Sequence, residues 1–308
     1  MNKIQDSGPA SIQPKPAAGG FLYGLLAYAL WGVLPIYFKA IAAVSAFDIV
    51  AHRVLWSLPF LGALIAMAGG WGKVTTAFAN AKALGVLAVT AVLIGGNWLL
   101  YVYAVTSGHI LAASFGYYLN PLANVLLGRF ILKEHLNRLQ WAAVAIATVG
   151  IAILAAGALA QLWISLTLCA SFALYGLLRK VVSADALTGL SIETAFLFPL
   201  ALAWLGWRAA NGAAVLGSTS TETTLLIFAG VASTTPLLLF TAAARKLAYS
   251  TLGMLQFLAP TLQLLIAVLL YGEPFTTAHA IAFAAIWTAL ALYVTVLIRK
   301  PRLPQAPE

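Results

Sequence analysis

Ten long apolar segments dominate this chain, and each is long enough to cross a lipid bilayer. A spanning helix needs about 20 mostly apolar residues. Only 8% of the residues are charged, against about 25% in ordinary soluble domains. The sequence therefore predicts an all-α integral membrane protein with ten transmembrane helices. The segments cover residues 19–40, 47–69, 81–104, 109–131, 139–158, 160–181, 188–207, 222–243, 249–271 and 278–298.

The apolar pattern occurs twice in the chain. Pro121 and Glu134 stand thirteen residues apart, and Pro260 and Glu273 repeat that spacing at an offset of 139 residues. Each pair closes a long apolar segment. Duplication within a hydrophobic chain is typical of transporters built from repeats, with the solute site at the repeat interface.

The positive charges orient the chain in the membrane. With the N-terminus in the cytoplasm, only Lys39, Arg53 and Arg208 of the 17 Lys and Arg residues fall on the outer side. This asymmetry predicts that both termini are cytoplasmic. The net charge of +9 then faces anionic lipid headgroups, so we expect membrane lipid and not nucleic acid as a partner.

The topology makes the repeat an inverted one. Residues 19–158 and 159–300 each hold five predicted spans, and an odd number forces the second half to begin on the opposite side of the membrane. The fold class that we expect is therefore two inverted five-helix repeats. Residues 1–18 are predicted to form a disordered cytoplasmic tail and residues 301–308 a second cytoplasmic tail.

A polar stripe runs along the second predicted span. Asp48, His52 and Trp56 follow at i, i+4 and i+8, with Arg53 beside them, so they share one helix face. Arg53 lies about six residues from the outer end, which is roughly 9 Å deep. It anchors an anionic group of a solute or forms an outer gate; alternatively, it reaches outward to the interface or pairs with Asp48.

Glu193 is the only acidic residue well within an apolar stretch, and the repeat relates it to Arg53 at an offset of 140 residues. A buried carboxyl group can carry a proton, so Glu193 is a candidate for proton coupling. The alternative is a structural ion pair with Arg179 or Lys180 on the same side. His52 is the second coupling candidate, because imidazole changes its protonation state near neutral pH.

The fourth and ninth predicted spans carry further polar side chains. Prolines in mid-span and paired irregularities at 95–97 and 234–236 predict broken helices at the solute site. Close packing by small residues, as at Gly20 and Gly24, is the alternative. The polar positions are Tyr117, Asn120 and Asn124 in one half and Gln256 and Gln263 in the other.

Aromatic residues accompany these polar stripes and can form the wall of a cavity for apolar, aromatic or cationic solutes. Ordinary packing between helices is the competing explanation for each. The candidates are Trp31, Trp56, Trp98, Tyr101, Tyr117 and Phe257. Four other tryptophans lie near span ends and are predicted as interfacial anchors: Trp71, Trp141, Trp163 and Trp207.

Other reactive side chains give little functional signal. Cys169 lies in an apolar span and is predicted to pack as a small hydrophobic residue. The four histidines show no metal-ligand spacing, so no metal and no cofactor are expected. Glu134 and Glu273 each precede a helix, where the N-terminal amides favour a carboxylate, so a capping role is predicted for both.

The residues taken together resemble the EamA-type repeat of the drug/metabolite transporter superfamily, and more closely its RarD family. The resemblance rests on segments in the second to ninth spans: AHRVLWS (51–57), AVLIGGNWLLY (91–101), ASFGYYLNPLANVLLG (113–128), SFALYGLLRK (171–180), IET (192–194), FTAAA (240–244), STLG (250–253) and YGE (271–273).

This resemblance implies a secondary transporter of the bacterial inner membrane that carries a small metabolite or drug-like solute by alternating access. It implies a central cavity between the halves and site residues among His52, Arg53, Trp56, Asn97, Trp98, Tyr117, Asn120 and Glu193. A passive channel or a non-transporting scaffold is the alternative. No enzyme is expected, since GxSxG, HExxH and Walker A motifs are missing from the sequence. The protein is expected to be a monomer or a homodimer.

Overall fold

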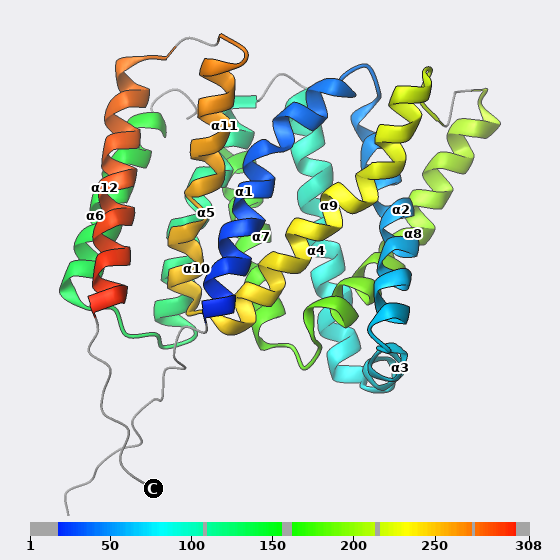
Figure 1. Cartoon of the computed structure of the whole chain (residues 1–308), viewed down its shortest axis with the longest axis horizontal. Helices are drawn as coiled ribbons and strands as arrows, with labels where there is room; N and C mark the ends of the chain where they lie inside the picture. The colour runs from blue at the N-terminus through cyan, green and yellow to red at the C-terminus, as the bar shows by residue number, and fades with distance from the viewer. Residues whose placement is uncertain (1–17, 107–109, 156–161, 213–215, 273–274, 300–308) are drawn as a thin grey trace, which may run out of the picture.

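The computed structural model describes residues 18–106, 110–155, 162–212, 216–272 and 275–299. These residues form a bundle of helices (Figure 1). The helices are α1 (Ala18–Ala40), α2 (Ala46–Met67), α3 (Trp71–Ala79), α4 (Ala81–Thr106), α5 (Ile110–Phe130), α6 (Arg138–Ala155), α7 (Leu162–Val181), α8 (Ala186–Ala210), α9 (Ser220–Lys246), α10 (Tyr249–Leu255), α11 (Leu258–Leu269) and α12 (Thr277–Arg299).

The prediction of an all-α membrane protein is confirmed. Within the described ranges, eight stretches are long and apolar enough to cross a membrane, namely α1, α2, α4, α7, α8, α9, the α10–α11 pair and α12. The fourth predicted span corresponds to α5 and the fifth to α6. The apolar part of α6, Arg138–Ile153, is shorter than the eight spanning stretches. The count of ten spans stays a prediction.

Three local predictions differ from the structure. The segment after α2 contains a further short helix, α3, which is not among the predicted helices. The span predicted at 249–271 is divided at Gln256–Phe257 into α10 and α11. Conversely, the breaks predicted at 95–97 and 234–236 are wrong, because α4 and α9 run through these positions as continuous helices.

Pro260 accounts for the division between α10 and α11. A proline has no backbone N–H and its ring clashes with the carbonyl four residues earlier, which here belongs to Gln256. That carbonyl instead accepts from the N–H of Ala259 at 3.2 Å, in a tighter turn. The helix axis is interrupted there, one turn before the proline.

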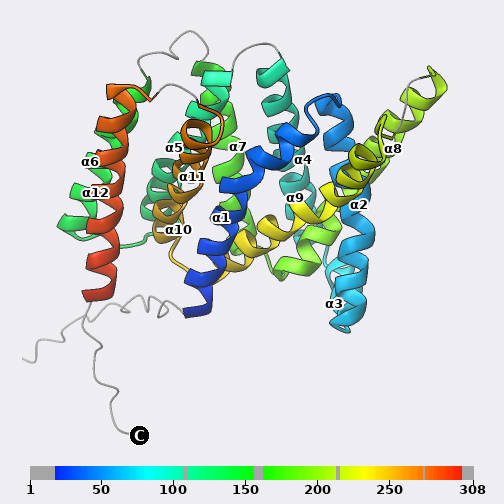
Figure 2. The ribbon, with the colours of Figure 1, turned by 45° about the horizontal axis from the view of Figure 1, so that its top comes forward.

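Successive long helices alternate in direction (Figure 1). The first residue of α1 and the last of α12 lie at the same end of the molecule, which is also where α3 lies. The helices α6 and α12 pack together at one edge, and α2 and α8 pack together at the other (Figure 2). Between these edges α1, α4, α5, α7, α9 and the α10–α11 pair form the centre.

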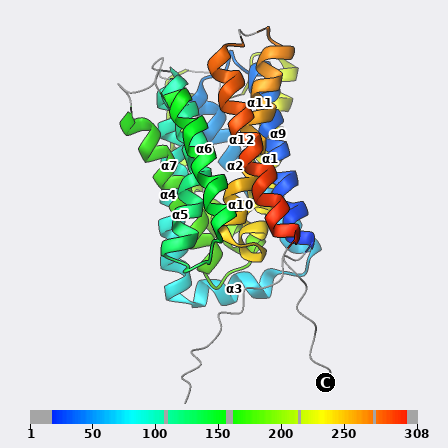
Figure 3. The ribbon, with the colours of Figure 1, turned by 90° about the vertical axis from the view of Figure 1, so that its left-hand side faces the viewer.

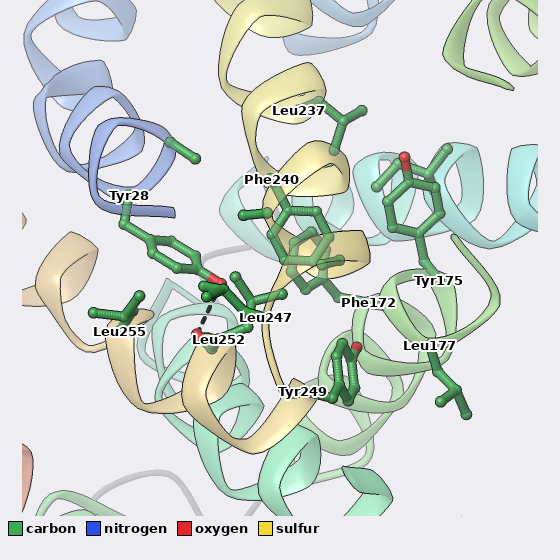
Figure 4. Close-up of a cluster of buried hydrophobic side chains, with 14 of the residues drawn as sticks. Tyr28, Phe172, Tyr175, Leu177, Leu237, Phe240, Leu247, Tyr249, Leu252 and Leu255 are labelled. Carbon is green, nitrogen blue, oxygen red and sulfur yellow. Dashed lines mark hydrogen bonds between the residues drawn. The ribbon is translucent and has the colours of Figure 1, made fainter. Parts of the chain in front are cut away.

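An aromatic core fills the space between α1, α7, α9 and α10 (Figure 4). Phe240 is fully buried, with its ring centre 5.2 Å from that of Phe172 and 6.4 Å from that of Tyr175. The hydroxyl of Tyr28 donates to the backbone oxygen of Leu252 at 3.1 Å, so its one polar atom is satisfied inside this core. The four helices are thereby fixed to one another.

Small residues allow close helix crossings, as predicted for Gly20 and Gly24. A Cβ at Gly20 would lie 2.8 Å from Lys246 Cβ, and one at Gly24 would lie 3.2 Å from Leu255 Cδ1. A third crossing brings Gly230 of α9 onto α2, where a Cβ would lie 2.4 Å from the backbone of Trp56. Only glycine permits this last contact, and it positions α9 against the polar stripe of α2.

The predicted interfacial tryptophans lie at helix ends with exposed side chains: Trp71 (55%), Trp141 (36%), Trp163 (55%) and Trp207 (56%). The predicted tails lie outside the described residues except for Ala18 at the start of α1, and so does Glu273.

Candidate functional site

Arg53 lies at the interface of three helices, α2, α4 and α9. From α2, its Nε donates to Ser233 Oγ on α9 at 2.7 Å. Its guanidinium carbon lies 4.4 Å from the ring centre of Trp98 on α4, which is a cation–π contact. No carboxylate among the described residues lies within ion-pair distance of Arg53.

The predicted alternative, an ion pair between Arg53 and Asp48, is wrong. Asp48 Oδ2 accepts from Arg208 Nη2 at 2.9 Å, and Asp48 Oδ1 accepts from Trp204 Nε1 at 2.9 Å. Both partners come from α8, so Asp48 ties α2 to α8. Arg53 therefore keeps a positive charge that no described acidic residue balances.

Three tyrosines lie near this cation. Tyr117, Tyr37 and Tyr101 lie within electrostatic reach of the guanidinium, and the ring centres of Tyr101 and Tyr117 are 5.6 Å apart. All three side chains are half-buried. Tyr101 and Tyr117 are among the cavity residues predicted from the sequence, whereas Tyr37 and Ser233 are not. The one signal in the sequence for Ser233 is its position directly before the irregularity at 234–236.

Asn97 on α4 connects Tyr117 on α5 to α7. Its buried amide nitrogen donates to Leu168 O at 3.0 Å and to Ser171 Oγ at 2.9 Å, while its oxygen accepts from Tyr117 OH at 3.3 Å. The side chain is thus fully engaged in joining α4, α5 and α7.

His52 and Trp56 form a pair one turn apart on α2. The Trp56 Nε1–H donates to His52 Nδ1 at 3.2 Å, and His52 is buried. This contact confirms that the polar stripe predicted for this helix shares one face. His52 directly precedes Arg53 in the sequence.

Amide side chains meet where α5 crosses α10. Asn124 Nδ2 donates to Gln256 Oε1 at 2.9 Å. The amide nitrogen and oxygen of Asn120 are buried and make no hydrogen bond in the structure. Because a buried, unpaired amide is costly, Asn120 is suited to accept and donate hydrogen bonds to a small polar molecule.

Gln263 and Phe257 have other surroundings. Gln263 is exposed, and its Nε2 donates to Trp31 O at 3.1 Å. Pro35, four residues after Trp31, has no N–H to offer that carbonyl, so Gln263 substitutes for the missing backbone bond. Phe257 is 1% exposed within an apolar cluster of α5, α6 and α12, which favours the packing interpretation.

Glu193 lies in a second polar cluster, buried like its partner Arg179 on α7. Arg179 Nε is 3.5 Å from Glu193 Oε1. Thr90 Oγ1 donates to the same oxygen at 2.5 Å, and Tyr175 OH donates to Oε2 at 3.3 Å. This arrangement agrees with the structural ion pair to Arg179, the predicted alternative to proton coupling.

The two clusters lie at different depths. Arg53 contacts Trp98 and Glu193 contacts Thr90, and these residues are eight positions apart on α4. At 1.5 Å per residue the separation along that helix is about 12 Å. Arg53 and Glu193 therefore belong to separate sites.

Two pockets open at the end of the molecule near α3, of about 370 and 240 Å³. None of the predicted cavity residues lines them. No group of three metal-ligating side chains occurs in the described part of the chain, and Cys169 is buried.

The polar and aromatic cluster around Arg53 is the candidate site. Its members are Arg53, Ser233, Trp98, Tyr37, Tyr101 and Tyr117. The chemistry of this cluster suits an anionic group on an aromatic or apolar body.

Comparison with known proteins gives a consistent result. Residues 18–156 match the EamA-like transporter family. The chain is 45% identical to an uncharacterized transporter of Vibrio cholerae, over 90% of this chain and 92% of that one. It is 43% identical to the protein RarD of Escherichia coli (92% and 96% covered) and 34% identical to the chloramphenicol-sensitive protein RarD of Pseudomonas aeruginosa (89% and 92% covered).

A protein of known crystal structure has the same fold. It superposes with a TM-score of 0.70 over 92% of this chain and 99% of its own, at 18% sequence identity. At that identity the likeness concerns the fold alone.

Proposed function

The chain belongs to the RarD family of the drug/metabolite transporter superfamily, and from this premise we propose that it is a secondary transporter that moves a small metabolite or drug-like solute by alternating access. The relatives described as transporters support this proposal. The apolar helices make the protein a multi-pass membrane protein. We place it in the bacterial inner membrane with both termini in the cytoplasm.

Arg53 is the observation that carries the proposal. A charge within a membrane span is costly unless it faces a cavity or a partner. Arg53 has one hydroxyl and one indole as neighbours and no acidic partner among the described residues. An anionic group of the solute would supply the missing charge, while Trp98, Tyr101 and Tyr117 would contact its apolar part.

The packing of the helices supports an inverted repeat. Suppose that α1, α2, α4, α5 and α6 correspond in order to α7, α8, α9, α10–α11 and α12. Each main helix–helix contact then corresponds either to another observed contact or to itself. The pair α1–α9 corresponds to α7–α4, α2–α9 to α8–α4, and α1–α11 to α7–α5. The pairs α2–α8, α5–α10 and α6–α12 map onto themselves. The Arg53 cluster would then lie at the interface of the two halves, where alternating access requires the solute site.

Substitution of Arg53 tests the solute site. Arg53→Lys keeps the charge but removes the planar fork, so we expect about tenfold weaker solute binding with little change in folding. Arg208→Lys is the matched control, because Arg208 also lies on the outer side but is paired with Asp48. Equal solute affinity in Arg53→Lys and wild type would remove Arg53 from the site, and loss of folded Arg53→Ala would make its role structural.

If the transporter accumulates its solute with the help of a proton gradient, we propose that His52 carries the proton. Arg179 already balances the charge of Glu193, whereas His52 adjoins Arg53. We therefore expect His52→Gln to keep solute exchange and to lose accumulation driven by a pH gradient. Glu193→Gln should instead lower the yield of folded protein, because it leaves Arg179 buried without a counter-charge. Folded Glu193→Gln that exchanges solute without pH-driven accumulation would return the coupling role to Glu193.

Counterflow separates a carrier from a channel or scaffold. Liposomes loaded with unlabelled solute should take up labelled solute transiently above its external concentration. A channel gives only equilibration, and a scaffold gives no uptake.

A further inference from the structure

The hollow beside α3 is distinct from the Arg53 cluster. Its two pockets share Lys73, Asp185 and Thr188 and lie between α3 and the beginning of α8. The larger pocket is also lined by Thr76, Asn80 and Ser183. Figure 3 shows α3 lying across the ends of the other helices, so the hollow opens where the chain leaves the membrane.

The hollow presents one positive and one negative group side by side. Lys73 Nζ lies 3.6 Å from Asp185 Oδ2, with the side chains 75% and 41% exposed. So exposed an ion pair contributes little to stability, and both groups are accessible to a ligand. Asp185 also begins α8, since its Oδ1 accepts from Thr188 N at 2.8 Å.

Asp185 is ionised at neutral pH. Burial acts to raise the pKa of this carboxyl, but hydrogen bonds from Thr188 and the charge of Lys73 outweigh it, so the pKa is lowered. The hollow therefore offers a fixed carboxylate and an ammonium group, together with the hydroxyls of Ser183 and Thr188. A ligand that carries both a cationic and an anionic group complements this pattern.

The surroundings of the hollow indicate that the ligand is attached to the membrane. Trp71, Val74 and Phe78 follow at i, i+3 and i+7 and share one face of α3. Trp71 is 55% exposed, Phe78 50% and neighbouring Met67 83%. Lys73 lies on the opposite face. A short helix with these two faces lies in the membrane interface, with the apolar face toward the acyl chains.

We propose that this hollow binds the phosphoethanolamine headgroup of a glycerophospholipid. Lys73 contacts the phosphate, the ammonium group donates to Asp185, and the acyl chains lie along Trp71, Phe78 and Met67. A choline headgroup has no N–H to donate, and a phosphoglycerol headgroup has no cation. Ethanolamine lipids are therefore preferred over both.

Lipid titrations in nanodiscs test this assignment through the thermal unfolding midpoint and through lipids retained in native mass spectrometry. For wild type we expect phosphatidylethanolamine to bind roughly tenfold more tightly than phosphatidylcholine or phosphatidylglycerol, as one charge-assisted hydrogen bond implies. Asp185→Asn keeps an N-cap oxygen and should remove the preference for ethanolamine over glycerol. Lys73→Gln should weaken the binding of both lipids.

Lys82→Gln is the matched control, since Lys82 lies near the same surface at the start of α4 but does not line the hollow. An equal loss in Lys82→Gln and Lys73→Gln would show general attraction to the lipid surface and overturn the proposal. Equal binding of the three lipids by wild type would also overturn the proposal. If soluble glycerophosphoethanolamine at the same concentration raised the thermal unfolding midpoint as much as the lipid does, the ligand would not be a lipid. These readouts require no solute transport, so they are independent of the transporter proposal.

Discussion

At the scale of single residues, two arginines have opposite electrostatic surroundings: Arg179 is fully buried and Arg53 is half-buried. Arg179 has a carboxylate 3.5 Å away and also donates to the carbonyls of Asp185 and Ala186. Arg53 has a hydroxyl and an aromatic ring instead. A buried cation whose counter-charge belongs to the protein stabilises one arrangement of helices. A half-buried cation without one is available to a ligand, which is why we propose Arg53 and not Arg179 for the solute site.

Gly189 provides a test of how tightly Arg179 is held. A Cβ at Gly189 would lie 1.8 Å from Arg179 Nη1, so the guanidinium would have to leave its position beside Glu193. We expect Gly189→Ala to lower the free energy of unfolding by about 3 kcal/mol, because it overfills the site and disturbs a buried ion pair. Thermal unfolding of the purified protein measures this change.

Gly206→Ala is the control for Gly189→Ala. Gly206 is also in α8, but a Cβ there would meet no atom within 4 Å. Alanine should then stabilise the helix by up to about 1 kcal/mol. If the two variants unfold at the same temperature, Arg179 is free to move and the cluster around Glu193 is not a rigid one.

At the scale of helices, Glu134 connects the two predicted halves by capping α10. Its Oε1 accepts from Tyr249 N at 2.5 Å, and its Oε2 accepts from Ser250 N at 3.0 Å and from Ser250 Oγ at 2.7 Å. The predicted capping role is correct, but the helix is α10 and not the adjacent α6. Sequence proximity selects α6, whereas the fold brings α10 closer to the carboxylate.

Removing this cap should loosen α10. Glu134→Ala leaves two backbone amides at the start of α10 without acceptors, so we expect a loss of about 1–3 kcal/mol in stability. Hydrogen exchange should accelerate at Tyr249 and Ser250. Glu222→Ala is the control, because Glu222 accepts from Ser218 at the exposed start of α9. Acceleration at α10 in both variants, or in neither, would contradict the capping role.

At the scale of the whole molecule, apolar length predicts the helices well but not where they break. Spans near 20 apolar residues leave the backbone no alternative to a helix in lipid. Whether a proline breaks a helix depends on its neighbours: α5 continues through Pro121, while α10 ends before Pro260. The short helix α3 escapes prediction because nine residues fall below the length of a span.

Candidate residues are predictable as a set but not as contacts. Polarity within apolar helices correctly selects Asn97 and Glu193 as buried polar positions and Arg53 as a half-buried one, because burial of such groups is rare without a reason. Their partners come from helices far away in the chain, such as Ser233 for Arg53. Only the packing of the helices determines these pairings.

The orientation of the whole molecule can be tested with single cysteines. Basic residues gather near the end that carries the start of α1 and the end of α12, so we expect that end to be cytoplasmic. Replacing the buried Cys169 with serine gives a background without cysteine. Ser218, before α9, and Thr75, in α3, are both exposed and lie at opposite ends.

With a membrane-impermeant thiol reagent, Ser218→Cys should be labelled in intact cells. Thr75→Cys should be labelled only after permeabilisation, since α3 lies on the cytoplasmic side in this orientation. The reverse pattern would invert the molecule and place Arg53 near the cytoplasm. Labelling of both sites in intact cells would be incompatible with a single orientation, and the positive-inside argument would then fail for this chain.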